Sequence, residues 1–172
     1  MIKVGILGAD TTAAGELIRI LINHPDVELV TIASDNETGR QANTVHRGLI
    51  GDTDLSFTPE LTPQGHDAVF LCGEPWMATK WMATHHEAAA ASGLRIIDLT
   101  GAFRDGSYNM VYGLPEHNRK ALVRGARCAS IPSPAAMAIE LALFPLAKNS
   151  LLDSPIAAIV NIAATEAFTA PA

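Results

Sequence analysis

The start of the chain restricts the fold most, because a short apolar run leads through two glycines into a helical pattern. Lys3–Leu7 predicts a buried strand, Gly8–Thr12 a loop, and Ala13–Asn23 a helix that is apolar most of the way round. Gly5 and Gly8 allow a tight turn, and the helix that follows offers free N–H groups to a phosphate. This order of strand, loop and helix predicts the dinucleotide-binding unit of a Rossmann-type fold.

The rest of the chain continues the alternation of apolar strands and helices. Such a pattern predicts an α/β fold with a doubly wound, mostly parallel sheet covered on both faces. Further strands are predicted at Val27–Ala33, Asp67–Cys72, Arg95–Leu99, Arg127–Ile131 and Ile156–Ala164. Further helices are predicted at Ala78–Ala91, with Gly93 as C-cap, and from Ser133-Pro134 to about Phe144, where Pro145 should end or kink the helix, while Thr100–Asn118 is less regular.

We expect two domains, of which the second is only begun. Residues 1–150 are predicted to form the dinucleotide-binding domain, and residues 151–172 the first strand and loop of a truncated catalytic-type domain.

Composition and charge exclude several kinds of protein. Apolar residues make up 48% of the chain and charged residues 17%, which is typical of a globular protein. The net charge of −6 argues against a nucleic-acid partner, and no apolar run is long and continuous enough for a membrane span. The two cysteines, Cys72 and Cys128, have no metal-ligand spacing, so no metal is expected. With no secretory signal, they indicate reduced thiols in a cytoplasmic protein.

The predicted phosphate loop departs from the usual glycine pattern. Thr11 stands where a third glycine is expected, and Asp10 places a carboxylate beside the position of a dinucleotide's diphosphate. A like-charge contact of this kind costs about 1 kcal/mol when it is exposed. Two interpretations therefore stay open: the loop binds NAD or NADP, or the fold keeps the loop and binds nothing.

An acidic residue follows the second predicted strand. Asp35 stands 20 residues after Gly15, where an acid normally accepts hydrogen bonds from the adenosine ribose and repels the 2′-phosphate of NADP. Asp35 would then favour NAD; its alternative role is that of an ordinary turn residue. The candidate cofactor-binding residues are those that follow the first three strands, namely Gly8, Ala9, Asp10, Thr11, Thr12, Ala13, Ser34, Asp35, Cys72 and Gly73.

Several longer stretches carry a family resemblance. The start, MIKVGILGA followed by GELIRILINHPDVELV, is joined by IIDLTGAFR at Ile96–Arg104, VYGLPEHNR at Val111–Arg119 and LALFPLAKNSLL at Leu141–Leu152. Together they resemble the N-terminal half of N-acetyl-γ-glutamyl-phosphate reductase, a semialdehyde-dehydrogenase-type enzyme. The resemblance implies NADP-dependent reduction of an acyl phosphate to a semialdehyde in arginine biosynthesis. It also implies a cysteine nucleophile at a helix N-terminus, where the dipole lowers the thiol pKa.

The position that resembles the nucleophile holds proline. The matching stretch is Ile131-Pro132-Ser133-Pro134, and the side chain of Pro134 has no nucleophilic atom. Cys128 lies six residues earlier on a predicted strand and fits a core thiol, while Ser133 fits a helix N-cap. We therefore predict no catalytic residue. Arg104, which the resemblance retains, is expected to form a structural ion pair, with contact to an anion as the alternative.

Three hypotheses about function follow. An active reductase requires a nucleophile that this sequence lacks. A catalytically inactive relative would bind a nucleotide or a protein partner, as a homo-oligomer or together with an active reductase. A third hypothesis, compatible with the second, is that the chain is part of a longer protein.

Overall fold

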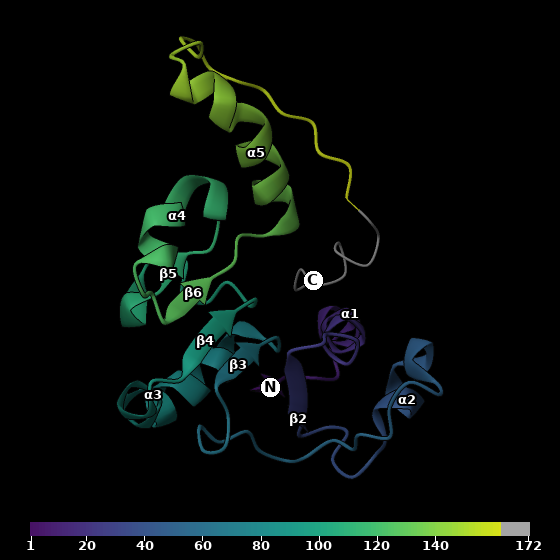
Figure 1. The fold of residues 1–172 in the computed structure, drawn as a ribbon. Helices are drawn as coiled ribbons and strands as arrows, with labels where there is room; N and C mark the ends of the chain where they lie inside the picture. The colour runs from purple at the N-terminus through teal and green to yellow at the C-terminus, as the bar shows by residue number, and fades with distance from the viewer. Residues whose placement is uncertain (163–172) are drawn as a thin grey trace.

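A computed structural model describes residues 1–162 and shows a parallel six-stranded sheet with helices around it (Figure 1). The strands are β1 (Ile2–Leu7), β2 (Val27–Ala33), β3 (Ala68–Leu71), β4 (Arg95–Asp98), β5 (Val111–Tyr112) and β6 (Cys128–Ser130). The helices are α1 (Thr12–Leu21), α2 (Ala42–Val45), α3 (Pro75–Ser92), α4 (Pro115–Val123) and α5 (Pro134–Lys148), with 3-10 turns η1 (Arg47–Leu49) and η2 (Ser107–Asn109). The predicted α/β class is confirmed.

The order of the strands creates a reversal beside β1. The sheet runs β2-β1-β3-β4-β6-β5, and every pair of neighbours is parallel. The chain therefore passes from β1 to β2 on one side and then crosses to β3 on the other side of β1. In open α/β sheets, ligands bind outside the carboxyl ends of the strands at such a switch point.

Two apolar clusters cover the two faces of the sheet. On one face Ile18 of α1 packs with Val4 and Ile6 of β1, and on the other Trp81 of α3 packs with Val69 of β3. Side chains of a strand alternate between faces, so β1 and β3 contribute to both clusters. Figure 1 shows α1 and α3 on opposite sides of the sheet, α4 beside β5, and α5 above α4 at the top of the view.

Two predictions concern the middle of the chain. The segment Thr100–Asn118 is less regular over most of its length, as predicted, but it also contains the short elements η2 and β5 and the start of α4. Helix α3 begins at Pro75, three residues before the predicted start, because proline suits a first helical turn. The C-cap at Gly93 is confirmed by its left-handed backbone, with φ +75°.

The C-terminal part differs more. Helix α5 passes Pro145 and ends at Lys148, because an exposed helix end tolerates the missing hydrogen bond to a carbonyl that water reaches. The strand predicted at Ile156–Ala164 is absent over residues 156–162, and its last two residues lie outside the described part. Residues 156–162 are exposed and have no neighbouring strand among the described residues, and an apolar sequence forms a strand only against a partner. Among residues 1–162, no helix combines the length and apolarity needed to cross a membrane.

Candidate functional site

The predicted cofactor-binding residues come together at one edge of the sheet. The carboxyl ends of β2, β1 and β3 are adjacent, since Leu7 of β1 is in register with Ala33 of β2 and with Leu71 of β3. The loops that follow these three strands therefore meet. The candidates Gly8–Ala13, Ser34-Asp35 and Cys72-Gly73 lie in these loops or at the first turn of α1.

The backbone of the loop after β1 lies directly against the backbone of the loop after β3. Gly8 has φ +68°, and a methyl group on its Cα would lie 2.2 Å from Gly73 Cα and 2.3 Å from Gly73 N. Only glycine fits Gly8, for conformational and steric reasons together. The backbone of Gly73 therefore occupies the space that a side chain at Gly8 would fill.

Thr11 tightens this loop. Its hydroxyl accepts the Ala14 N–H at 3.3 Å as the N-cap of α1. The same hydroxyl lies 3.0 Å from the Gly8 carbonyl oxygen and 3.1 Å from that of Cys72, where its hydrogen is donated. The side chain of Thr11 thus connects the loop after β1, the loop after β3 and the first turn of α1.

The first turn of α1 retains free donors. The N–H groups of Asp10, Thr12 and Ala13 have no acceptor among the described residues. Thr12 and Ala13 are exposed. Free N–H groups at a helix start, together with the helix dipole, attract an anionic phosphate.

The end of β2 forms a hydrogen-bonded turn. Ser34 is buried, and its hydroxyl accepts the Glu37 N–H at 3.3 Å while its carbonyl accepts the Thr38 hydroxyl at 2.8 Å. Asp35 is exposed, and the amide of Asn36 donates to Asp10 Oδ2 at 3.3 Å. Ser34 therefore shapes the turn, while Asp35 and Asp10 offer carboxylates at the same edge.

Both cysteines are poor nucleophiles in this fold. Burial, with a further contribution from the charge of Asp98, raises the pKa of the Cys72 thiol to about 12. Partial burial likewise raises the pKa of Cys128 on β6. Cys72 contributes its carbonyl to the loop, and its thiol lies in the core beneath it.

A buried carboxylate that the sequence analysis did not single out organises the loop after β4. Asp98 is fully buried and accepts hydrogen bonds from the Thr100 N–H at 2.9 Å, the Thr100 hydroxyl at 2.5 Å and the Ser130 hydroxyl at 2.6 Å. The Phe103 N–H also points to it, at 3.4 Å. An acid at the end of an apolar strand, two residues before a threonine, is the signal that identifies such a turn.

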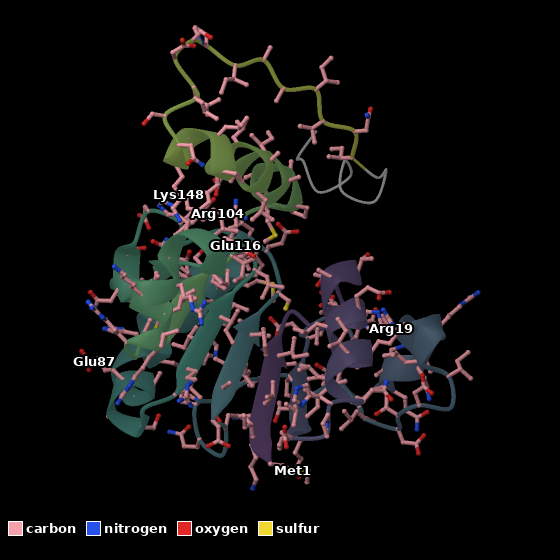
Figure 2. The ribbon with its side chains drawn as sticks, turned by 45° about the horizontal axis from the view of Figure 1, so that its top comes forward. Met1, Arg19, Glu87, Arg104, Glu116 and Lys148 are labelled. Carbon is pink, nitrogen blue, oxygen red and sulfur yellow. The ribbon has the colours of Figure 1, made fainter. Side chains whose placement is uncertain are left out.

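Arg104 connects this loop to the start of α5. Its Nε donates to the Ile131 carbonyl at 3.1 Å, and its guanidinium packs over Gly101, where a methyl group would lie 2.4 Å from Cζ. The predicted ion pair is not found among the described residues, because a main-chain carbonyl takes its place. In Figure 2, Arg104 lies below α5, at the end of the sheet opposite Met1.

The start of α5 has the predicted geometry. Ser133 is the N-cap and accepts the Ala136 N–H at 3.3 Å, and Pro134 is the first helical residue. Nearby, the hydroxyl of Tyr112 donates to Glu140 at 2.7 Å, and this hydrogen bond raises the pKa of Tyr112. Tyr112 and Glu140 border a cavity of about 430 Å³ between α4 and α5.

A second contact missed from sequence supports α1 from its outer side. His46 donates from Nε2 to the Ala9 carbonyl at 2.7 Å, which fixes the ring proton on that nitrogen. Its ring packs on Gly15, where a methyl group would lie 2.5 Å from Nδ1. Gly15 thus makes room for His46 beside a cavity of about 320 Å³. Arg19, labelled in Figure 2, also borders this cavity.

Comparison with known proteins identifies the family of this chain. The family model described as semialdehyde dehydrogenase, NAD binding domain, matches residues 3–124. The N-acetyl-γ-glutamyl-phosphate reductase of Phocaeicola vulgatus is 43% identical over 158 residues, covering 91% of this chain and 48% of the relative. That of Bacteroides thetaiotaomicron is 39% identical over 173 residues, covering 99% and 52%. The chain spans about half the length of these curated relatives.

Solved structures share the fold at low identity. Aspartate semialdehyde dehydrogenase with NADP from Candida albicans superposes with a TM-score of 0.65 at 18% identity, covering 87% of this chain and 47% of that one. Aspartate semialdehyde dehydrogenase II from Vibrio cholerae gives a TM-score of 0.62 at 18% identity, covering 86% and 47%. With the family model matching most of its length, the chain belongs to the semialdehyde dehydrogenase NAD-binding domain family.

Proposed function

We propose that this protein binds a nicotinamide dinucleotide, NAD or NADP, through the loops after β1, β2 and β3, and does not itself reduce an acyl phosphate. The observation that carries the proposal is the contact of Gly8 with Gly73 in front of the free N–H groups of Thr12 and Ala13. Backbone placed this close lets a diphosphate approach the start of α1.

The two residues that argued against binding have other partners. Thr11 turns its hydroxyl to the Gly8 and Cys72 carbonyls, and its other role is to cap α1. The Asp10 carboxylate lies within hydrogen-bond distance of Asn36, on the loop after β2. Both contacts support a loop that is altered in sequence and still open to a ligand.

The absence of acyl-phosphate chemistry is proposed from the thiols. The resemblance to reductases places the nucleophile at Pro134, which has none. Cys128 and Cys72 have raised pKa values, so neither supplies a thiolate near neutral pH. We therefore propose a catalytically inactive relative of N-acetyl-γ-glutamyl-phosphate reductase.

Binding is tested by calorimetry with NAD and NADP on the whole chain and on two variants of one exposed residue. Ala13→Asp adds a negative charge at the first turn of α1, which stabilises the helix but repels a phosphate. We expect Ala13→Asp to keep or raise the thermal midpoint and to weaken binding at least tenfold. Ala13→Asn, of the same shape, should bind much more like the wild type. No heat and no thermal shift with either dinucleotide refutes the proposal.

Catalysis is tested in the direction that reduces the nicotinamide cofactor, because the reduced form absorbs in the near ultraviolet. N-acetylglutamate semialdehyde and phosphate are mixed with the protein and, in parallel samples, with NAD or NADP, and the absorbance of the reduced cofactor is followed. We expect the rate of cofactor reduction to equal that of a blank without protein. A phosphate-dependent rate that scales with protein concentration contradicts the loss of chemistry.

We also propose that residues 151–172 begin a catalytic-type domain. We further propose that the chain assembles through α5, as a homo-oligomer or with an active reductase. Helix α5 is rich in apolar residues, yet none is fully buried among the described residues, and Leu141 and Leu146 are exposed. Sedimentation of the wild type and of a Leu141→Lys, Leu146→Lys variant tests this, alone and mixed with a reductase. A monomer that does not bind the reductase rules out the assembly.

A further inference from the structure

The edge of the sheet at β2 carries negative charge from two loops. Asp10 follows β1 and Asp35 follows β2, three and two residues after the paired strand ends Leu7 and Ala33. The Ala9 N–H donates to the Ala33 carbonyl at 2.9 Å, and Asn36 donates to Asp10 Oδ2 at 3.3 Å. These two hydrogen bonds hold the two loops together, so both carboxylates belong to one rim of the site.

Two arginines near this rim are already paired with carboxylates. Arg40 forms an ion pair with Glu37 in the loop after β2. Arg19, on the outer side of α1, pairs with Glu16 at 2.7 Å. Arg47 of η1 is the remaining arginine between β2 and β3. A 2′-phosphate normally needs a cation at this position, whereas a 2′-hydroxyl needs an acceptor.

We propose that this site takes NAD and excludes NADP, with Asp10 and Asp35 together as the determinants of that choice. The inference rests on the proposed function, because it requires that a dinucleotide binds. Asp35 accepts hydrogen bonds from the ribose hydroxyl, and Asp10, whose carboxylate Asn36 holds toward the loop after β2, adds a second negative charge to the same rim. Asn36 is a positioning residue, since its amide holds the Asp10 carboxylate toward the end of β2.

The direct test is calorimetry of the whole chain with NAD and with NADP at one fixed, low ionic strength. We expect NAD to bind at least tenfold more tightly, which corresponds to about 1.4 kcal/mol. Added salt should reduce this ratio, because it screens the repulsion between charges. If the two bind equally, or NADP more tightly, the selectivity is refuted while the proposed function stands. If neither binds, the proposed function fails and the selectivity with it.

Variants test which charges decide. Asp10→Asn and Asp35→Ser should each move the ratio of affinities toward NADP, and Asn36→Ala should do so less than Asp10→Asn. Glu87→Gln removes the same charge from the exposed face of α3, away from the site, and should leave the ratio unchanged (Figure 2). An equal change in Glu87→Gln means that net charge acts and overturns the assignment. Loss of NADP binding in Arg47→Gln would reveal a cation site for the 2′-phosphate and overturn it as well.

Discussion

The contact between Gly8 and Gly73 makes a quantitative prediction about stability. In Gly8→Ala, alanine must adopt φ +68°, which costs about 1–2 kcal/mol for an L-residue. Its methyl group must also displace the Gly73 backbone, and overpacking of this kind costs about 1–3 kcal/mol. The total loss in the free energy of unfolding is therefore about 2–5 kcal/mol, a large part of the stability of a domain this size.

A matched control separates the two costs. Gly65 has φ +80°, and a methyl group there would meet nothing within 4 Å. Gly65→Ala should lose only the backbone contribution of about 1–2 kcal/mol. In Gly73→Ala the new methyl group would lie 2.8 Å from the sulfur of Met77, a flexible side chain, and 3.3 Å from Gly8 Cα, so its cost should be smaller than that of Gly8→Ala.

Urea unfolding of the wild type and the three variants, monitored by circular dichroism, measures these differences in the free energy of unfolding. The comparison requires that the variants have the same m-value as the wild type. We expect Gly8→Ala to lose about 1–3 kcal/mol more than Gly65→Ala. If Gly8→Ala loses no more than Gly65→Ala, the loops after β1 and β3 are not in contact. The basis for the proposed diphosphate site is then removed.

Three further predictions concern thiols and the outer side of α1. Pro134→Cys places a thiol at the exposed start of α5, where the helix dipole lowers the pKa of the thiol. Iodoacetamide should therefore label this cysteine at pH 7 well before Cys128, as measured by mass spectrometry, and equal labelling of the two contradicts the prediction. Burial raises the pKa of Cys72 from 9.0 to about 12, so the thiol's contribution to stability is complete below pH 9 and is lost as the pH rises toward 12. Between pH 9 and pH 12, the free energy of unfolding measured in urea should therefore fall less in Cys72→Ala than in the wild type. Gly15→Ala should lower the free energy of unfolding of the wild type, because the new methyl group clashes with His46, but should raise that of the His46→Ala variant by about 0.5–1 kcal/mol. A change of the same sign in both proteins refutes the packing of His46 on Gly15.

The fold was largely predictable, because its signals are local. The apolar runs of β1 to β4 and β6, the proline after Ser133 and the glycine after α3 each act on their own segment. Strand β5 was missed because two residues carry no periodic pattern, and its position depends on pairing with β6. The segment 156–162 shows the opposite error: its sequence favours a strand, but a strand needs a neighbour, which no local signal reports.

The candidate site was predictable in its residues and less so in their roles. Gly8 follows from the strand–loop–helix order, but its steric partner Gly73 lies in the loop after β3, a strand that is adjacent to β1 only through the crossover. Asp10 is in conflict with a phosphate when the loop is considered alone, and only the folded chain brings Asn36 within reach of its carboxylate. His46 lies far from Gly15 in sequence, so their contact leaves no local trace.

The motifs that resemble a reductase have structural roles in this chain that need no reaction. Within IIDLTGAFR, Asp98 holds the turn at Thr100 and ties it to Ser130, and Arg104 binds the Ile131 carbonyl. Within VYGLPEHNR, Asn118 donates from its amide to the Tyr112 carbonyl at 3.1 Å. The bonds from Ser130 to Asp98 and from Arg104 to Ile131 join the loop after β4 to the end of β6, and the bond from Asn118 to Tyr112 joins α4 to β5. A match to these motifs therefore identifies the fold, because hydrogen bonds within the sheet and its loops account for each of them.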